Sequence, residues 1–398
     1  MEKKFLNQGF RWYGPEDSVS LDYIKQAGAE SVFTSLHHIP YGELWTKEEI
    51  LKRKKIIEDA GLTWSAVESV PVSEQIKTRT GDFQRHIDNY KATLENLRLC
   101  DIDLVIYNFM PVLDWIRTDL NYTLSDGSTC LRFDPAQFAA FEIYMLKRAG
   151  AEADYDAETL SRAKSFYESL SAEKLLEFER TIIDVFPGCK LGLGLDDIRK
   201  MLNAYSEIDT DKLREHLKLF LQEVVPVAEK FGVRLAIHPD DPPFPVLGLA
   251  RIASRIEDFR KILSYCDSPS NSIAFCTGSL SASAHNDLPK MLEELKEKIY
   301  VVHLRSTQRE KDGSFIEAGH IEGSVPMYEI VKKLLEIQKE RLEKGGSRII
   351  FRPDHGRLLA DDLEKPQLAN PGYSYIGRMK GLAELRGLQF GILNSSCK

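Results

Sequence analysis

The sequence predicts an α/β fold, a (β/α)8 TIM barrel with a helical insertion after the fourth strand. Two observations predict it. Short runs rich in β-branched and aromatic residues recur along the 398-residue chain, and amphipathic helical patterns lie between them. This alternation is typical of parallel βα units, and eight such units favour a closed barrel over an open doubly wound sheet. We expect residues 1–398 to form a single catalytic domain.

The expected elements follow one another in the order strand, helix, strand. The strands are expected at residues 8–13, 31–36, 62–67, 103–108, 233–238, 272–276, 299–304 and 348–353. The helices expected between them include 17–27, 46–60, 82–100, 210–231, 287–297 and 326–343. Several of these helices end at a glycine, such as Gly28, Gly61 or Gly232, which is a common helix terminator.

Residues 109–209 interrupt this regular spacing between the fourth and fifth strands. The segment contains helix-like stretches, AQFAAFEIYMLKRAG and AETLSRAKSFYESLSAEKLLEFERTIIDVF. A structureless loop of this length is improbable in a compact domain, so a helical insertion is expected. Because the loops at this end of a barrel surround its active site, we expect the insertion to act as a lid or as an oligomer contact. A homo-oligomer is expected.

Composition excludes several classes of function. Acidic residues outnumber basic ones, 61 to 53, and no block rich in Lys and Arg occurs, which argues against a nucleic-acid partner. No apolar run has the length of a signal peptide core or of a membrane span, so a cytoplasmic protein without a membrane partner is expected. The six cysteines, at 100, 130, 189, 266, 276 and 397, form no CxxC pair, which argues against a disulfide framework or a zinc ribbon.

Four successive expected strands end in residues that commonly bind metals. The fifth strand ends at His238, the sixth at Cys276, the seventh at His303, and the eighth leads into Asp354. Each taken alone has an ordinary structural explanation as a rim, packing or turn residue. Because the carboxyl ends of parallel barrel strands form one face, however, all four are expected around the same mouth. We interpret them as the ligands of a transition-metal ion.

Arginines share the strand faces of these ligands. Residues two apart in a strand point to the same side, so Arg305 accompanies His303 and Arg352 accompanies Asp354. Arg305 is expected to hold the carboxylate of an anionic substrate near the metal. For Arg352, two roles explain its position equally well: contact with the anionic substrate, or an ion pair inside the barrel.

The first two strands end in residues suited to a sugar-like ligand. We expect Arg11, Trp12 and His37 to contact the substrate, although the sequence leaves open which of His37 and His38 faces the mouth. Beyond His238, Asp240 and Asp241 either hydrogen-bond sugar hydroxyls or the groups that support the metal ligands, or form a turn among the neighbouring prolines.

Several segments together resemble one family, D-mannonate dehydratase. They are FRWYGPEDSVSLDYIKQAGA, SLHHIPYGELW, IYNFMP, IHPDDPPFPVLG, FCTGSLS, VVHLRS and FRPDHGR. The resemblance is strongest over residues 9–45 and 233–377 and weakest across 109–209.

The resemblance implies a xylose-isomerase-like TIM barrel that dehydrates D-mannonate to 2-keto-3-deoxy-D-gluconate in hexuronate (glucuronate) catabolism, with Mn²⁺ or Fe²⁺ as cofactor. It implies the same four metal ligands as the strand ends. It also implies a catalytic tyrosine, for which Tyr373 is the first choice and Tyr375 the second. We expect Tyr373 and His355 to share the acid and base roles, in an order that the sequence leaves open.

Two other functions are compatible with a metal site on this barrel. One is a metal-dependent sugar isomerase or epimerase, although a cysteine ligand disfavours it because such enzymes usually rely on several carboxylates. The other is a non-catalytic scaffold stabilised by metal, which would need a closed tetrahedral site.

Overall fold

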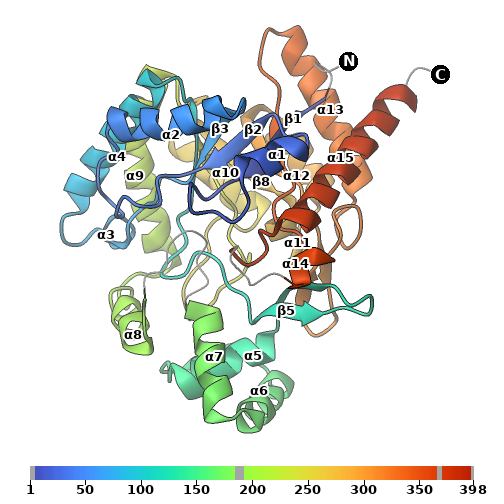
Figure 1. Ribbon diagram of the computed structural model, residues 1–398. Helices are drawn as coiled ribbons and strands as arrows, with labels where there is room; N and C mark the ends of the chain where they lie inside the picture. Colours follow the sequence, from blue (N-terminus) through green and yellow to red (C-terminus); the bar gives the residue numbers. More distant parts are fainter. Residues whose placement is uncertain (1–4, 184–191, 365–369, 396–398) are drawn as a thin grey trace.

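The computed structural model describes residues 5–183, 192–364 and 370–395. At its centre lies a closed barrel of parallel strands (Figure 1), and the predicted fold class is confirmed. Around the barrel the strands follow the order β1-β12-β9-β8-β7-β4-β3-β2. Their bounds are β1 (Asn7–Arg11), β2 (Ser31–Thr34), β3 (Thr63–Glu68), β4 (Leu104–Tyr107), β7 (Arg234–Ile237), β8 (Asn271–Cys276), β9 (Ile299–His303) and β12 (Ile350–Arg352). Each overlaps one of the expected strands.

The barrel interior contains its own small apolar cluster. Its members are buried residues of six strands: Phe33, Ala66, Leu104, Ile106, Ala236, Ala274 and Val301. A much larger core lies between the outer faces of the strands and the helices. The barrel is therefore a packed core up to the level of this cluster, and only the residues beyond it can line an open site.

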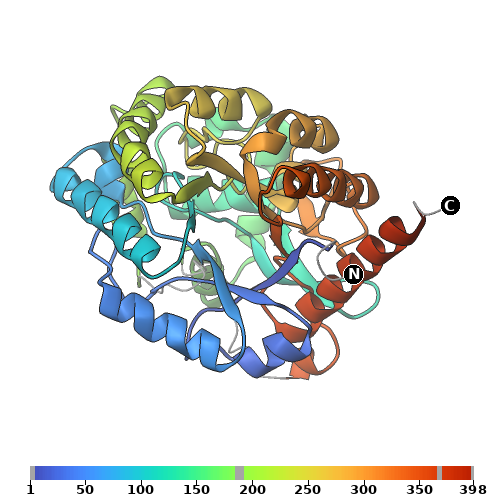
Figure 2. The same ribbon diagram turned by 90° about the horizontal axis from the view of Figure 1, so that it is seen from above.

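Helices surround the barrel on its outside, as the view from above shows (Figure 2). Along the chain they are α1 (Leu21–Gln26), α2 (Lys47–Asp59), α3 (Glu74–Thr78), α4 (Phe83–Leu99), α9 (Thr210–Phe231), α10 (Ile256–Tyr265), α11 (Thr277–Ser281), α12 (Leu288–Leu295), α13 (Met327–Glu343), α14 (Asp361–Glu364) and α15 (Tyr375–Ser395). A short 3-10 turn, Lys296–Lys298, follows α12.

Helix α9 illustrates how the sequence builds this layer. Its buried residues Leu213, Leu217, Phe220 and Val224 recur every three or four positions, so they form one apolar stripe that faces the core. The helix ends at Gly232, whose φ of 70° is a left-handed conformation that glycine adopts without strain. The chain then turns directly into β7.

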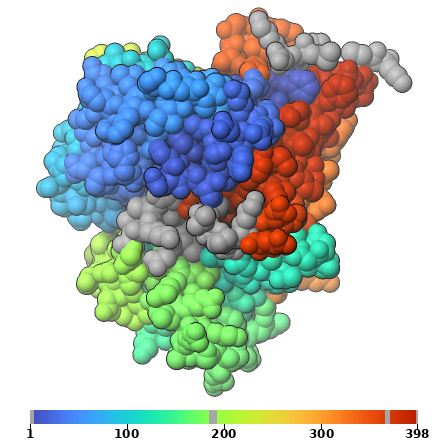
Figure 3. Space-filling view, in the orientation of Figure 1, coloured from blue at the N-terminus to red at the C-terminus, as the bar shows by residue number. Residues whose placement is uncertain are grey.

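The segment between β4 and α9 forms a separate lobe at the carboxyl end of the barrel (Figure 3, green). As expected, it contains helices: α5 (Pro135–Ala140), α6 (Ala157–Ser169), α7 (Ala172–Ile183) and α8 (Leu195–Asn203), with short π and 3-10 helices at Phe141–Met145 and Ala151–Asp154. It also contains a hairpin, β5 (Asp119–Thr123) and β6 (Thr129–Phe133), that was not expected from the sequence. Residues 184–191 of the predicted insertion lie outside the described residues.

A second sheet connects this insertion to the barrel. The hairpin β5–β6 pairs with β11 (Phe315–Glu317), which pairs with β10 (Thr307–Arg309), in the antiparallel order β10-β11-β6-β5. Phe315 lies opposite Phe133, and their rings stack with centroids 5.5 Å apart. Because β10 and β11 follow barrel strand β9, this pairing fixes part of the insertion over the barrel mouth.

Two further predictions concern the described part of the chain. Cys100, Cys130, Cys266 and Cys276 are free thiols, while Cys189 and Cys397 lie outside the described residues. No described helix combines the length and the apolar character that crossing a bilayer requires.

Candidate active site and metal centre

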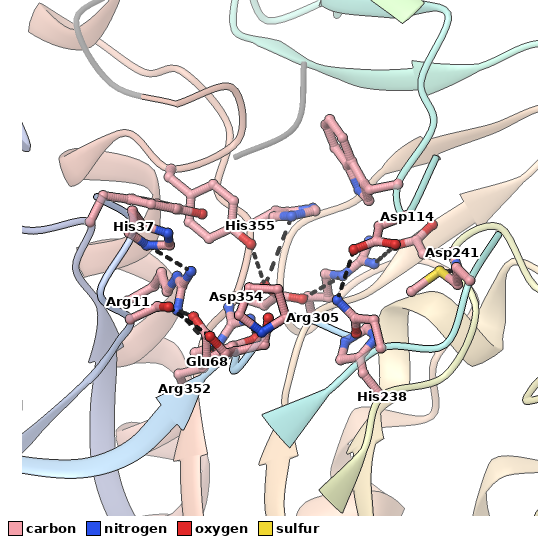
Figure 4. Close-up of a pocket in the computed structure, with 18 of the residues that line it drawn as sticks. Arg11, His37, Glu68, Asp114, His238, Asp241, Arg305, Arg352, Asp354 and His355 are labelled. Carbon is pink, nitrogen blue, oxygen red and sulfur yellow. Dashed lines mark hydrogen bonds and ion pairs between the residues drawn. The ribbon is translucent and has the colours of Figure 1, made fainter. Parts of the chain in front are cut away.

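A polar pocket opens at the carboxyl ends of the barrel strands (Figure 4). It has a volume of about 700 Å³, part of which is open to solvent. Its lining includes Arg11, His37, Glu68, His238, Asp354 and Tyr373. In barrels of this type catalysis takes place at this end.

The alternation of side chains along the strands explains why these groups point inward. Ala236, Ala274 and Val301 belong to the interior apolar cluster, and His238, Cys276 and His303 each lie two residues further on. Because residues two apart share a face, the polar groups form the next layer of the barrel interior. The same register brings Ser35, Glu68 and Asn108 to the pocket after Phe33, Ala66 and Ile106.

Three of the predicted metal ligands converge at the floor of this pocket. Donor atoms of His238, Cys276 and His303 all lie within 4.8 Å of one another. Nε2 of His238 is 3.1 Å from Nδ1 of His303, and the fourth predicted ligand, Asp354, places Oδ2 3.6 Å from Sγ of Cys276. Ligands that share a transition metal at bond lengths of about 2.0–2.3 Å are separated by roughly 3–4 Å. The donor set fits such an ion.

The contacts of each imidazole direct one ring nitrogen towards this cluster. Nδ1 of His238 lies 2.7 Å from the carbonyl oxygen of Pro239 and donates its proton there, so Nε2 is the nitrogen that would bind a metal once it is deprotonated. Nδ1 of His303 lies 3.4 Å from Nη2 of Arg352, which can only donate, so Nδ1 carries the lone pair and the proton is on Nε2, 3.4 Å from Oε1 of Glu68. Acceptors behind metal-binding histidines usually fix the tautomer in this way.

Cys276 has the electrostatic character of a thiolate. Burial alone would raise its pKa, but Arg305 and hydrogen bonds with His238 and His303 outweigh that effect and hold the pKa well below its usual value. The hydroxyl of Ser279 also donates to its sulfur at 3.1 Å. A thiolate is the form of cysteine that binds metals.

Arg305 is bonded to three carboxylates. It donates from Nε to Asp354 at 2.7 Å, from Nη1 to Glu317 at 2.6 Å, and from Nη2 to Asp241. The guanidinium is 2% exposed, and these acceptors use its donors. Its contact with substrate stays a prediction, while its visible role is to hold carboxylates in place.

Arg352 forms an ion pair inside the barrel, which is one of the two roles that its position in the sequence allowed. It donates through Nε and Nη2 to the two carboxylate oxygens of Glu68, at 2.8 and 2.6 Å, and through Nη1 to Asp354. Burial would raise the pKa of Glu68, but Arg352, His303 and Arg11 lower it to about 2. Glu68 is therefore ionised between two guanidiniums and the imidazole of His303.

The second sheet contributes a buried salt-bridge network beside the pocket. Arg117, which is 0% exposed in its side chain, donates to Asp241 at 2.8 Å and to Glu317 at 2.9 Å. Asp241 lines the pocket and pairs with Arg117 and Arg305, while its contact with sugar hydroxyls stays a prediction. Asp240 points elsewhere, accepting from Ala253 N at 2.7 Å and from Ser254 Oγ at 2.8 Å.

His355 is oriented by a carboxylate of the second sheet. Its Nδ1 donates to Oε1 of Glu317 at 3.0 Å, so Nε2 carries the lone pair. The ring lies edge-on to Trp115 and to Tyr373, with centroids 5.4 and 4.9 Å apart. His355 lines the pocket and has the geometry of a positioned proton acceptor.

Of the two candidate tyrosines, Tyr373 lines the pocket. Its hydroxyl donates to Oδ1 of Asp354 at 3.3 Å. Burial raises its pKa, nearby Tyr13 and Asp354 raise it further, and it stays well above the ordinary value, so the phenol is protonated. Tyr375 is absent from the pocket lining and packs instead against Tyr23, with ring centroids 5.0 Å apart.

His37 and His38 point in opposite directions. His37 lines the pocket with Arg11, whose Nη2 lies 3.4 Å from the His37 Nε2 atom. His38 is exposed and forms a 2.8 Å contact with Glu49 on α2. The open choice between the two histidines is therefore settled by geometry in favour of His37 as the pocket residue.

Trp12 does not line the pocket, which argues against its predicted contact with substrate. Its side chain is 3% exposed and lies beneath the guanidinium of Arg53, 5.3 Å from the ring centroid. Arg11 and Tyr13 occupy the pocket face, so the residue between them must point outward to the helix layer.

Several pocket residues were missed in reading the sequence. Glu68 is the last residue of β3 and Asn108 directly follows β4, so the rule that identified His238 could have found them. Asp114 and Trp115 line the pocket from the insertion, and Glu317 of the second sheet contacts the pocket residues Arg305 and His355. No local pattern marks those three.

Comparisons with known proteins show the family of the chain. The family model of D-mannonate dehydratase (UxuA) matches residues 6–397. The chain is 52% identical to a mannonate dehydratase of Marinomonas sp. (strain MWYL1), over 97% of this chain and 99% of that protein. It is 50% identical to the mannonate dehydratase of Chromohalobacter salexigens, again over 97% of this chain and 99% of the relative.

Solved structures give the same result. The crystal structure of mannonate dehydratase from Streptococcus suis serotype 2 superposes with a TM-score of 0.76 at 30% identity, covering 99% of this chain and 95% of that one. A xylose isomerase domain protein from Planctomyces limnophilus matches at a TM-score of 0.50 and 11% identity, over 98% and 99% of the two chains, and shows the shared fold alone. From the family match and these relatives, the chain belongs to the D-mannonate dehydratase family.

Proposed function

We propose that this chain dehydrates D-mannonate to 2-keto-3-deoxy-D-gluconate and water, as a step of hexuronate (glucuronate) catabolism. A divalent transition metal, Mn²⁺ or Fe²⁺, would be held by His238, Cys276, His303 and Asp354. Family membership supports the reaction. The observation that carries the metal assignment is the meeting of the Cys276 sulfur and one ring nitrogen each of His238 and His303 at the pocket floor.

The charges of the site support a substrate with a carboxylate. Four buried guanidiniums, of Arg11, Arg117, Arg305 and Arg352, are balanced by the carboxylates of Glu68, Asp241, Glu317 and Asp354. Around the metal site the Cys276 thiolate adds one negative charge, and a divalent ion would leave these groups with a net charge of +1; Asp114, at the far end of the pocket, lies outside this sum. An aldonate carries the single negative charge that neutralises it, and buried charge must be compensated.

Dehydration requires loss of the C2 proton and of the C3 hydroxyl. The main barrier is negative charge that accumulates next to the substrate carboxylate when C2 is deprotonated. When bound, the metal would supply Lewis-acid stabilisation of that charge. The protein's own groups then need only to hold the sugar acid and to transfer protons.

His355 and Tyr373 are placed for the two proton transfers. Nε2 of His355 is a free acceptor because Glu317 holds the proton on Nδ1, so His355 takes the C2 proton. Tyr373 is a hydroxyl donor, so it protonates the C3 hydroxyl, which leaves as water. The resulting enol returns its hydroxyl proton to Tyr373, and His355 delivers its proton to C3, which yields the keto acid and restores both groups.

Reconstitution with metal tests this function. Protein freed of metal with a chelator is incubated anaerobically with Mn²⁺, Fe²⁺ or Zn²⁺ and D-mannonate, and 2-keto-3-deoxy acid is measured. We expect no product without metal and turnover with Mn²⁺ or Fe²⁺. Full activity of the metal-free protein, or production of an epimer in place of the keto acid, would contradict the proposal.

A further inference from the structure

The two ends of the pocket differ in charge. Arg11 and His37 lie at one end, and Asp114 lies at the other, with Asp354 and Arg305 between them (Figure 4). Asn108 lines the pocket beside Asp114 and donates from Nδ2 to its Oδ2 atom at 3.3 Å. An extended sugar acid that passes the metal site would meet both ends.

Asp114 differs from the other carboxylates of the pocket. Glu68, Asp241 and Asp354 each accept hydrogen bonds from at least two guanidinium nitrogens. Within the described parts of the chain, no guanidinium lies within 4.0 Å of Asp114. Its nearest cation is the ammonium of Lys77, at 3.7 Å.

Lys77 only partly neutralises Asp114. The ammonium lies closer to Glu74, at 2.7 Å, and donates to the carbonyl of Met110 at 2.6 Å. An ionised carboxylate has about four acceptor positions, and Asn108 fills one of them. Asp114, with a side chain 17% exposed, thus keeps negative charge and free acceptor positions at the pocket wall.

At the end of the pocket opposite Asp114, the positive charge of Arg11 is less fully paired than that of the other arginines. Arg305 and Arg352 each bond at least two carboxylates, whereas the nearest carboxylate oxygen to Arg11, of Glu68, is 4.0 Å away. Its hydrogen bonds go to the carbonyl of Glu68 and to His37. Arg11 therefore keeps more of its positive charge for a bound anion than the other two.

Resting on the proposed function, we propose that Asp114 determines which sugar acids the enzyme accepts. Arg11 binds the single carboxylate of the substrate. At the far end of the sugar, Asp114 accepts hydrogen bonds from the hydroxyls and the amide of Asn108 donates to them. Asp114 thereby selects aldonates, which end in a hydroxymethyl group, and rejects aldarates, which end in a second carboxylate. Rejection follows because a carboxylate facing Asp114 would place two like charges together in a poorly solvated site.

Kinetics with two substrates that differ only at C6 test this selectivity. D-mannonate and D-mannarate are assayed as substrates, and D-mannarate also as a competitive inhibitor, with metal-loaded wild type and Asp114→Asn. We expect the ratio of kcat/KM for mannarate to that for mannonate to rise about tenfold or more in Asp114→Asn, and the inhibition constant of mannarate to fall by a similar factor. Asp101→Asn, an equal change of charge at an 81%-exposed side chain outside the pocket lining, should leave both quantities unchanged.

A second variant covers the case in which Asp114→Asn does not fold. Asn108→Asp adds negative charge at the same wall and should weaken inhibition by mannarate about tenfold relative to binding of mannonate. If the wild type is active and both variants prefer mannonate over mannarate as strongly as the wild type does, the role of Asp114 is overturned. The proposed function then still stands. A metal-loaded wild type that fails to dehydrate mannonate would overturn the proposed function, and this inference with it.

Discussion

The Nε2 atom of His238 and the Nδ1 atom of His303 lie 3.1 Å apart, although 64 residues separate them in the chain. Each ring directs its other nitrogen at an acceptor of the protein, the Pro239 carbonyl and the Glu68 carboxylate. Two neutral imidazoles would gain nothing from facing lone pair to lone pair. A cation between them, a proton or a metal ion, would stabilise this arrangement.

Metal affinity should therefore rise with pH. In the metal-free protein, burial would lower the pKa of His238, but a hydrogen bond and the charge of Cys276 raise it to about 9. A metal must displace that proton, so its apparent affinity should increase as the pH rises towards about 9 and level off above it. Titrations with Mn²⁺ between pH 6 and pH 9, read by calorimetry in two buffers of different ionisation enthalpy, should show proton release. Affinity that is independent of pH would contradict this prediction.

Glu317→Gln should slow turnover without loss of metal. The substitution removes the negative charge that orients His355 and that pairs with Arg117 and Arg305. We therefore expect kcat to fall about 10- to 100-fold. Metal content, measured by atomic absorption, should stay at one ion per chain. Glu310→Gln is the matched control, because Glu310 pairs with Arg132 next to the same sheet and outside the pocket lining, and its kcat should be normal.

Tyr373→Phe should reduce kcat about 100-fold, because the C3 hydroxyl loses its proton donor while the ring remains. KM and metal content should change little. Tyr375→Phe, two residues further on, alters a tyrosine that packs against Tyr23 and should behave as wild type. The assignment would be wrong if the two variants had the same kcat.

The buried ion pairs should make stability sensitive to acid. Burial would raise the pKa of Asp241, but Arg117 and Arg305 lower it to about 2, below the value of about 3.9 in an unfolded chain. A lowered pKa contributes stability that is complete above about pH 4 and is lost as the pH falls towards 2. The melting temperature should therefore decline over that window.

Asp241→Asn supplies the comparison for this pH dependence. The variant should be less stable at pH 7, because two buried guanidiniums lose a charged partner, and its melting temperature should change less between pH 4 and pH 2. Parallel curves for the variant and the wild type would show that Asp241 does not contribute to the acid transition.

The sequence was sufficient to predict the barrel and the floor of its site because both depend on local patterns. Apolar runs, alternation and strand ends locate His238, Cys276 and His303 without knowledge of their neighbours. The same alternation explains why Arg11 faces the pocket and Trp12 does not. The wrong prediction that Trp12 contacts the substrate was therefore avoidable. The hairpin β5–β6 also left a local signal, since residues Asp126-Gly127 separate two segments of β character.

Other parts of the site depend on contacts between distant segments. Glu317 reaches His355 only because β11 pairs with the hairpin of the insertion, and Asp114 reaches the pocket only because the insertion folds over the barrel mouth. Neither position differs in local sequence from an exposed acidic residue. The same holds for the pairing of Arg352 with Glu68, which joins the eighth barrel strand to the third.

The central claim is that the Cys276 thiolate and the two imidazoles hold one metal ion. Cobalt(II) substitution tests it most directly, because a thiolate bound to cobalt produces an intense charge-transfer absorption in the near ultraviolet. We predict one cobalt per chain with this band in the wild type, and loss of the band in Cys276→Ser, with Cys130→Ser as a control that keeps it. A wild-type cobalt protein without the band, or a band that persists in Cys276→Ser, would contradict the account.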